Sequence, residues 1–288
     1  MPIDKLINIL VTITLLEMMV TIGLGVTIPQ VTSVGKDGKL VARAEIANYL
    51  LVPLAALGLL MAGHAHPMVA AGFLIAAVCP GAPYGPPFTG LAKGNVPVAV
   101  GLMVILAGPS ALVAPLLLHF LLPIIAGNKP LKVNAVKMVA TLLFTQLLPL
   151  CAGLALRWKR PGLALKLEGP AKRLSMLLNL LVFGFILYVQ WHILTSIRPG
   201  EFLRMFLLVL ATFVIGWAMG GSNVRTRRAM TASTAVRNVG IALVIATGSF
   251  PGTAAVTSAF AYAVFQTVLL ALVVLAWGKT LSVEEAVA

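Results

Sequence analysis

The sequence predicts an all-α polytopic membrane protein with about nine transmembrane helices, and three observations support this fold class. Hydrophobic residues make up 60% of the 288 residues and charged residues only 10%, whereas a soluble domain carries roughly 45–50% and about 25%. The mean hydropathy is +1.02. Apolar runs of about 20 residues, the length that crosses the hydrocarbon core as a helix, recur along the chain. These runs lack the two-residue alternation of barrel strands, which excludes a transmembrane β-barrel.

Nine apolar runs account for almost the whole chain. They lie at about 5–28, 44–62, 67–92, 96–125, 133–157, 174–196, 202–220, 227–249 and 253–278. The first run follows Lys5 as in a signal peptide, but it is too long for a signal h-region and lacks a small-residue cleavage site, so we interpret it as a span. The runs leave no room for a soluble domain, and residues 1–288 are expected to form a single transmembrane domain.

The basic residues predict the orientation in the membrane. Lys and Arg number 21 against 8 Asp and Glu. With the N-terminus outside, fourteen of the basic residues fall on the inner side and six on the outer side. This bias follows the positive-inside rule and predicts a multi-pass protein of the plasma (inner) membrane, with an outer N-terminus and a cytoplasmic C-terminus. The positive charge therefore indicates orientation and contact with the lipid bilayer, not nucleic-acid binding.

The third run contains a segment that cannot continue an α-helix. Four prolines fall between Cys79 and Phe88: Pro80, Pro83, Pro86 and Pro87. Each proline removes a backbone donor and clashes with the preceding turn. One proline would be compatible with a simple kink, but four predict a functional break. Unpaired backbone at membrane depth is tolerated only inside protein or beside a wet cavity.

The eighth run carries a charged residue near its middle. Arg237 and Asn238 follow the small hydroxyl residues Ser233 and Thr234, and Arg237 lies about ten residues from either end of the run. An Arg at the centre of a membrane helix costs about 2.5–3.5 kcal/mol on insertion scales. Extension of the side chain to the interface is the alternative, but this position predicts an inward Arg that faces a partner, a cavity or a ligand.

The two interruptions occupy equivalent places, since each lies in the next-to-last span of its half of the chain. Matched interruptions of this kind are typical of inverted-repeat secondary transporters, whose substrate site lies near the bilayer midplane. Half-helix ends that meet there present free N–H and C=O groups.

At these residues the chain resembles the bile acid:sodium symporter family. Cys79-Pro80-Gly81 and the exit at Lys93-Gly94-Asn95 resemble the first crossover helix of that family, and 231–242 resembles the second. The resemblance covers nearly the whole chain. It implies two inverted repeats, as in the nine-span members that lack the first of ten helices. It also implies a core from about 39–125 and 202–279 that moves against a panel from about 5–28 and 131–196.

The resemblance also carries over individual positions. The family's sodium sites use hydroxyl and amide groups after the first break and hydroxyls on the next span. Those positions fall on Gly85 and Pro86, and near Met103 and Leu106. The substrate site is predicted to comprise Pro83, Tyr84, Gly85, Ser233, Thr234, Arg237, Asn238, Gln266 and Thr267.

The second crossover departs most from the family's pattern. A Glu of that pattern falls on Ser233 and a Gln on Arg237, while Asn238 is kept; the family's His–Asn pair falls on Gln266 and Thr267. The exchange removes one negative charge and adds one positive charge. We therefore expect a secondary transporter of a small organic anion, coupled to protons or working by exchange, with Arg237 as a resident cation. A symporter with a backbone-based sodium site is the alternative, and sodium stays open.

Glu17 is the one acid predicted at mid-span. It is interpreted as a proton site, as a partner of a basic group such as Arg237, or as an interface-facing residue. Arg237 could also pair only with backbone carbonyls and fix packing. Cys79, Cys151, His64 and His66 show no spacing that indicates a disulfide or a metal site.

Two other function classes compete with the transporter. An intramembrane enzyme needs an acid or base beside its partner, and no HExxH, paired-acid or nucleophile motif is found. A structural subunit has no use for matched broken helices. The chain is therefore not expected to be an enzyme. We expect a small organic anion and the lipid bilayer as partners, and no resident cofactor or metal; the oligomeric state stays open.

Overall fold

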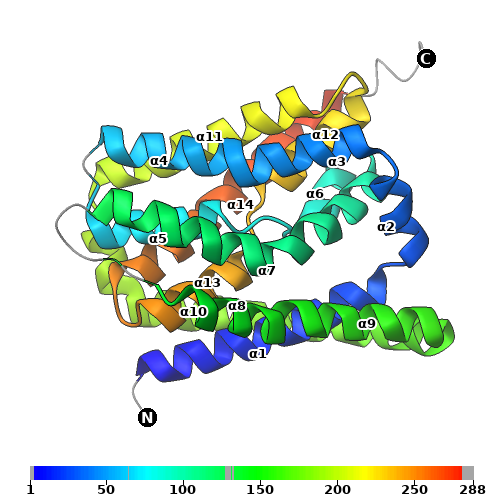
Figure 1. The fold of residues 1–288 in the computed structure, drawn as a ribbon, viewed down its shortest axis with the longest axis horizontal. Coiled ribbons are helices and arrows are strands. Elements are labelled where there is room, and N and C mark those ends of the chain that lie inside the picture. Colours follow the sequence, from blue (N-terminus) through cyan, green and yellow to red (C-terminus); the bar gives the residue numbers. More distant parts are fainter. Residues whose placement is uncertain (1–2, 64, 127–130, 132, 281–288) are drawn as a thin grey trace.

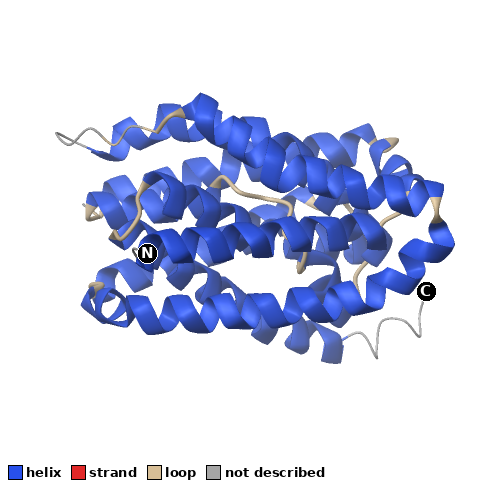
Figure 2. Cartoon of the chain, turned by 90° about the horizontal axis from the view of Figure 1, so that it is seen from below, coloured by secondary structure: helices blue, strands red, loops and turns tan. Residues whose placement is uncertain are grey.

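The computed structural model describes residues 3–63, 65–126, 131 and 133–280, and all regular structure in these ranges is helical (Figure 2). The predicted all-α fold class is confirmed. The first half contains α1 (Ile3–Gly25), α2 (Ile28–Gly35), α3 (Gly38–Ile46), η1 (Ala47–Leu51), α4 (Val52–Ala62), α5 (Pro67–Ala77), α6 (Gly85–Leu91) and α7 (Val96–Ala126). The second contains α8 (Ala135–Leu142), η2 (Leu143–Leu147), α9 (Leu148–Lys159), α10 (Pro161–Ser196), α11 (Pro199–Met219), α12 (Val224–Ala235), α13 (Val239–Ser249) and α14 (Ala254–Thr280).

Among the described residues, eight helices or helix pairs are long and apolar enough to cross a membrane. The predicted third span is not one of them, because the chain leaves helical conformation between Ala77 and Gly85 and forms the short helices α5 and α6. The predicted eighth span is also broken, at residues 236–238, and it is the most deeply buried of the eight. The multi-pass character is confirmed, and the count of nine stays a prediction.

The helices form layers whose axes run roughly along the long axis of the molecule (Figure 1). In that view α4, α11 and α12 lie along the upper edge, and α1, α9 and α10 lie along the lower edge. Helix α1 packs against α9, α10 and α13, whereas α11 packs against α12 and α4. The half-helices α5, α6 and α13 lie between these layers, and α12 continues from the upper layer toward α13.

Helices α1 and α9 cross at two glycines. A Cβ on Gly23 would lie 2.4 Å from Leu150 O, and a Cβ on Gly153 would lie 2.3 Å from Val20 O. Because neither position has room for a side chain, the two backbones touch. Small residues at helix crossings are typical of membrane proteins, where close backbone approach supplies packing energy.

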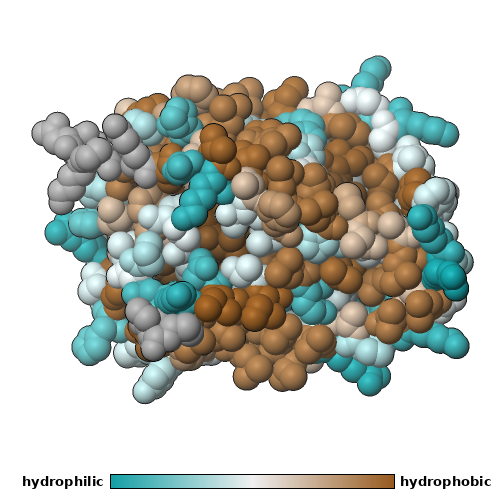
Figure 3. All heavy atoms as spheres, turned by 60° about the horizontal axis from the view of Figure 1, so that its bottom comes forward, coloured by the Kyte–Doolittle hydropathy of each residue, from teal (hydrophilic) through white to brown (hydrophobic). Residues whose placement is uncertain are grey.

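The outer surface is apolar around the middle and polar at both ends. Figure 3 shows hydrophobic residues over the central part of one face and hydrophilic residues gathered toward its two ends. Large side chains such as Phe120, Phe144, Tyr188 and Val214 are more than 60% exposed. A surface of this kind fits a hydrocarbon environment and not water.

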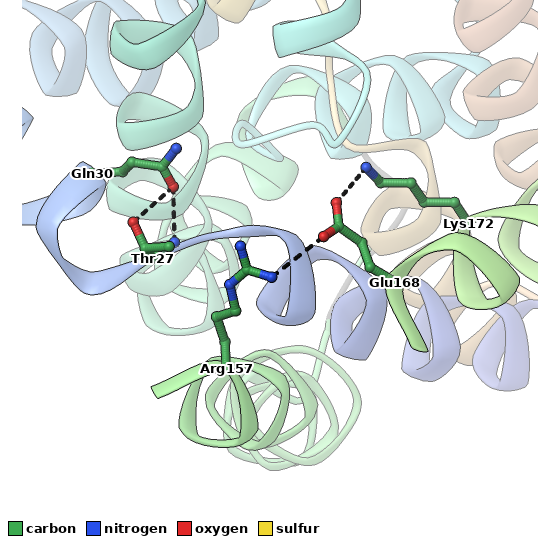
Figure 4. Close-up of polar contacts among 5 residues, drawn as sticks. All are labelled: Thr27, Gln30, Arg157, Glu168 and Lys172. Atoms are coloured by element: carbon green, nitrogen blue, oxygen red, sulfur yellow. Dashed lines mark hydrogen bonds and ion pairs between the residues drawn. The ribbon is translucent and has the colours of Figure 1, made fainter. Parts of the chain in front are cut away.

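Helix α10 begins much earlier than the predicted span at 174–196. Its first turns mix leucines with charged residues, and Glu168 accepts from Lys172 Nζ at 2.6 Å, one turn further on. Arg157 Nη1 of α9 lies 3.5 Å from the other oxygen of Glu168 (Figure 4). The helix therefore continues beyond the apolar run because its charged turns are paired.

Candidate functional site

The two broken helices meet at Asn238. Its backbone N–H donates to Cys79 O (2.7 Å), and its side-chain Nδ2 donates to Gly81 O (3.2 Å). Its Oδ1 accepts from Ile241 N (3.2 Å) and caps the start of α13. One predicted site residue thus joins the second break to the first.

The first break is pressed against α7. Gly81 has a φ of +77°, in the region that favours glycine. A Cβ at this position would lie 2.5 Å from Ala107 N of α7. Both the conformation and the space therefore require glycine, and the backbone of the break lies directly on α7.

Helix α14 holds the backbone of the second break through Gln266. The N–H of Arg237 donates to Gln266 Oε1 (2.8 Å), and Gln266 Nε2 donates to Arg237 O (3.1 Å). Gln266 is 1% exposed. A non-helical residue inside the membrane thereby has both of its backbone groups satisfied.

The side chain of Arg237 is buried without a hydrogen-bond partner. It is 1% exposed, and within the described residues none of its three guanidinium nitrogens has a partner. The ionisable groups close enough to interact with it are Tyr262, Cys79 and Tyr49. None of these is an acid that would carry a counter-charge at neutral pH. A buried cation without a counter-charge is costly and is typical of a binding site for an anion.

Two buried hydroxyls near the breaks are also unpaired in the described structure. They belong to Tyr262 and to Ser233. Tyr262 interacts with Arg237, and Ser233 lies beside Gly85, whose Cβ would be 3.7 Å from Ser233 Oγ. Guanidinium groups only donate, and hydroxyl groups can donate. The chemistry of the free groups therefore matches an anionic ligand.

The other predicted site residues are not all gathered here. Thr234 is buried, and its Oγ1 accepts from Asn48 Nδ2 (3.4 Å). Pro83 is partly buried. Tyr84 is 42% exposed. Thr267 is exposed and donates to Ala263 O of its own helix (2.8 Å). Gln266 and Thr267 are thus adjacent in sequence, but only Gln266 lies at the break.

Glu17 does not pair with Arg237. Its carboxylate accepts from Thr21 Oγ1 (2.7 Å) and from Ser175 Oγ (2.5 Å). No ion pair joins it to a basic group in the described part of the chain. It lies close enough to Tyr84 for an electrostatic interaction.

A cavity of about 700 Å³ opens at the end of the molecule that carries the N-terminus. Its walls are the first half of α1, residues 133–142 and the end of α13. Asn8 Nδ2 donates to Thr247 Oγ1 across its wall (2.8 Å). Further along α1, Leu15 and Met18 pack on Gly240, each within 3.0 Å of the place a Cβ would take. This contact lies between the cavity and the second break.

Sequence reasoning missed Tyr262 and Tyr49 as neighbours of Arg237. Tyr262 lies four residues before Gln266 and is therefore on the same face of α14. That four-residue spacing could have predicted that Tyr262 lies near the second break together with Gln266. Tyr49 comes from η1, a π-helical turn, and no local pattern points it toward the breaks.

The chain is similar to known transport proteins. The model of the sodium bile acid symporter family matches residues 12–197, which is more than half of the chain. A relative from Bacillus subtilis (strain 168), named "Uncharacterized sodium-dependent transporter YocS", is 25% identical over 252 residues. The match covers 84% of this chain and 74% of the relative.

Proposed function

The chain belongs to the sodium bile acid symporter family, and we propose that it is a secondary transporter of a small organic anion that binds at Arg237. The observation that carries the proposal is the buried guanidinium without a partner. A carboxylate would supply the missing counter-charge and could accept two parallel N–H bonds from it. Because this is a transporter family, we assign the chain no enzymatic role.

Transport would proceed by alternating access between a core and a panel. We take α1, α8–α9 and α10 as the panel, and the broken helices with α3–α4, α7, α11 and α14 as the core. Polar contacts between these groups are few, and they include Asn8–Thr247 and Gln190–Thr257 (2.8 Å each). Contacts of this kind can break and re-form as the core moves, and an anion at the break would be carried with it.

The resident-cation role of Arg237 is supported by the state of the backbone oxygens at the first break and on α7. The carbonyls of Cys79 and Gly81 accept from Asn238, and those of Leu106 and Ala107 accept from Tyr49 and Gln146. Sodium is a hard cation that needs several oxygen ligands. Each of these carbonyls already accepts a hydrogen bond, and a fixed positive charge at the second break would repel a second cation bound nearby.

A sodium-coupled symporter is the second candidate. It is favoured by the name of the family and by the printed name of the relative as a sodium-dependent transporter. In this case sodium would bind through backbone oxygens that become free in another conformation. We propose the plasma membrane with an outer N-terminus as the setting for either mechanism.

The test begins with a thermal-shift screen of pyruvate, succinate, citrate and taurocholate, with and without sodium, on the purified protein. Stabilisation grows with ligand concentration relative to Kd. Uptake of the most stabilising acid is then measured in proteoliposomes for the parent, for Arg237→Gln and for Arg173→Gln. Arg173 is exposed in the first half of α10, so Arg173→Gln is the matched loss of one charge.

We expect Arg237→Gln to weaken binding by roughly tenfold or more, because a hydrogen bond to a charged group contributes about 1.5–3 kcal/mol. Arg173→Gln should behave like the parent, and sodium should have little effect on either. An absolute requirement for a sodium gradient in the parent would favour the second candidate. Normal affinity in a correctly inserted Arg237→Gln protein would exclude Arg237 as the anion site.

A further inference from the structure

Glu17 carries a carboxylate in the middle of the membrane helix α1. The proposed anion site does not use this carboxylate. It lies fourteen residues after the start of α1 and eight before its end, so it is about 12 Å from the nearer end of the helix. Acids at such depth are rare and usually mark an ion or proton pathway. It is partly buried, between the panel helix α10 and the first break.

The partners of Glu17 differ in kind from those of the other described, ion-paired glutamates. Glu168 is held by Arg157 and Lys172, and Glu201 by Arg204 Nη1 (2.6 Å). A basic partner favours the ionised carboxylate. Glu17 has the hydroxyls of Thr21 and Ser175 instead. A hydroxyl can donate to a carboxylate and can accept from a protonated carboxyl, so the same two partners satisfy both protonation states.

The elements packed around Glu17 differ in the ionisable groups that they carry. Helix α13 and η2 carry no ionisable side chain. Helix α9 carries Cys151, Arg157 and Lys159, and α10 carries Lys166, Glu168, Lys172, Arg173, Tyr188 and His192. No ion pair joins any of these to Glu17 in the described structure. The first break contributes Tyr84, and it is the group that interacts with Glu17.

The first break connects Glu17 to the anion site. Tyr84 lies at the end of the break nearer Glu17, and Cys79 lies at the end nearer Arg237. On α1, Leu15 and Met18 of neighbouring turns pack on Gly240 of the second break. Glu17 thus lies on the panel beside the first break, while Leu15 and Met18 of the same helix pack on the second break.

We infer that the carboxylate of Glu17 is the proton-binding site that couples anion transport to a proton gradient. The inference rests on the proposed function. An ionised carboxylate at a sliding apolar surface resists the desolvation that movement imposes. Binding of one proton from the medium removes that charge, and the proton is released to the opposite side after the core has moved. One monovalent anion and one proton together carry no net charge across the membrane.

The first experiment detects the proton without any substrate. Infrared spectra of the purified parent are recorded over a pH titration, and the carboxylic-acid C=O band is followed. The same titration is run on Glu17→Gln and on Glu168→Gln, a matched change at an ion-paired carboxylate of the panel. We expect the parent-minus-variant difference spectrum of Glu17→Gln to contain a titrating C=O component that the parent and Glu168→Gln share.

The second experiment measures uptake of the most stabilising acid of the screen into proteoliposomes with an inward proton gradient. We expect the gradient to speed uptake by the parent and by Glu168→Gln several-fold, and to have no effect on Glu17→Gln. Exchange of internal for external acid should survive in Glu17→Gln, because exchange needs no net proton movement. Surviving exchange also shows that this variant is folded.

The two proposals fail in different ways. Uptake by the parent that depends on Arg237 but ignores the proton gradient would overturn the role of Glu17 and leave the anion site intact. A Glu17→Gln protein that still responds to the gradient would do the same. Should none of the four acids bind, the proposed function itself would be overturned, whatever the infrared titration shows.

Discussion

At the scale of single residues, the candidate site depends on how the backbone of Arg237 is held as well as on the charge of its side chain. Gln266 binds both backbone groups of Arg237 and leaves the guanidinium without a partner in the described structure. The side chain is therefore oriented by a neutral amide from another helix. An acid in place of Gln266 would tend to neutralise the guanidinium that the proposed function requires.

Replacement of Gln266 tests this arrangement. In Gln266→Leu two buried backbone groups lose their partner, at a cost of about 1–3 kcal/mol each. We expect a lower melting temperature and a higher KM for the transported acid. Thr267→Val should change neither quantity, because the Thr267 hydroxyl is exposed and bonds only to its own helix. Equal effects from both variants would show that the two residues act together at the site.

At the scale of helices, the proposed panel contains a close crossing of α1 and α9. Gly23 and Gly153 bring the two backbones into contact, and the same α1 carries Glu17 and the packing face for Gly240. Movement at this crossing would therefore displace the surface that meets both breaks.

A methyl group at the crossing should separate the helices. For Gly23→Ala we expect a loss of about 1–3 kcal/mol of stability, since overpacking forces the backbones apart, and slower transport. Gly184→Ala on α10 is the matched control, because a Cβ there meets nothing within 4 Å. Thermal unfolding of the detergent-purified variants measures the difference. A Gly23→Ala protein as stable as Gly184→Ala would mean that the crossing is loose.

At the scale of the whole molecule, the charge bias and the helix directions together predict the orientation. Helix α10 has 36 residues and is therefore about 54 Å long, enough to place its two ends on opposite sides of a bilayer. Lys166 and Ser222 are exposed at the end predicted to be inner, and Arg198 is exposed at the other.

Single cysteines test that orientation in intact cells. Cys151 is exposed and Cys79 is buried, so the background is Cys151→Ser. We expect a membrane-impermeant maleimide to label Arg198→Cys and to spare Lys166→Cys and Ser222→Cys until the membrane is permeabilised. Labelling of Lys166→Cys from outside would invert the proposed topology.

The features that the sequence predicted by itself are those that depend on local chain properties. Apolar length predicted membrane helices, proline and glycine between Cys79 and Phe88 predicted a break, and a charge at Arg237 marked the second interrupted span. Each follows from the free energy of placing a short segment in hydrocarbon, which does not depend on the rest of the chain. The early start of α10 was missed because charged residues interrupt its leucines, so the segment has no continuous apolar run.

The partners in the site were decided only by the tertiary structure. Asn238 and Gly81 are 157 residues apart, and Glu17 and Ser175 are 158 apart. Gln266 and Thr267 were equivalent in sequence, yet the rotation of α14 brings one to the break and turns the other outward. Which side chains meet depends on how helices cross and rotate against one another. Those choices are made by packing across the whole molecule, because no single segment contains both partners.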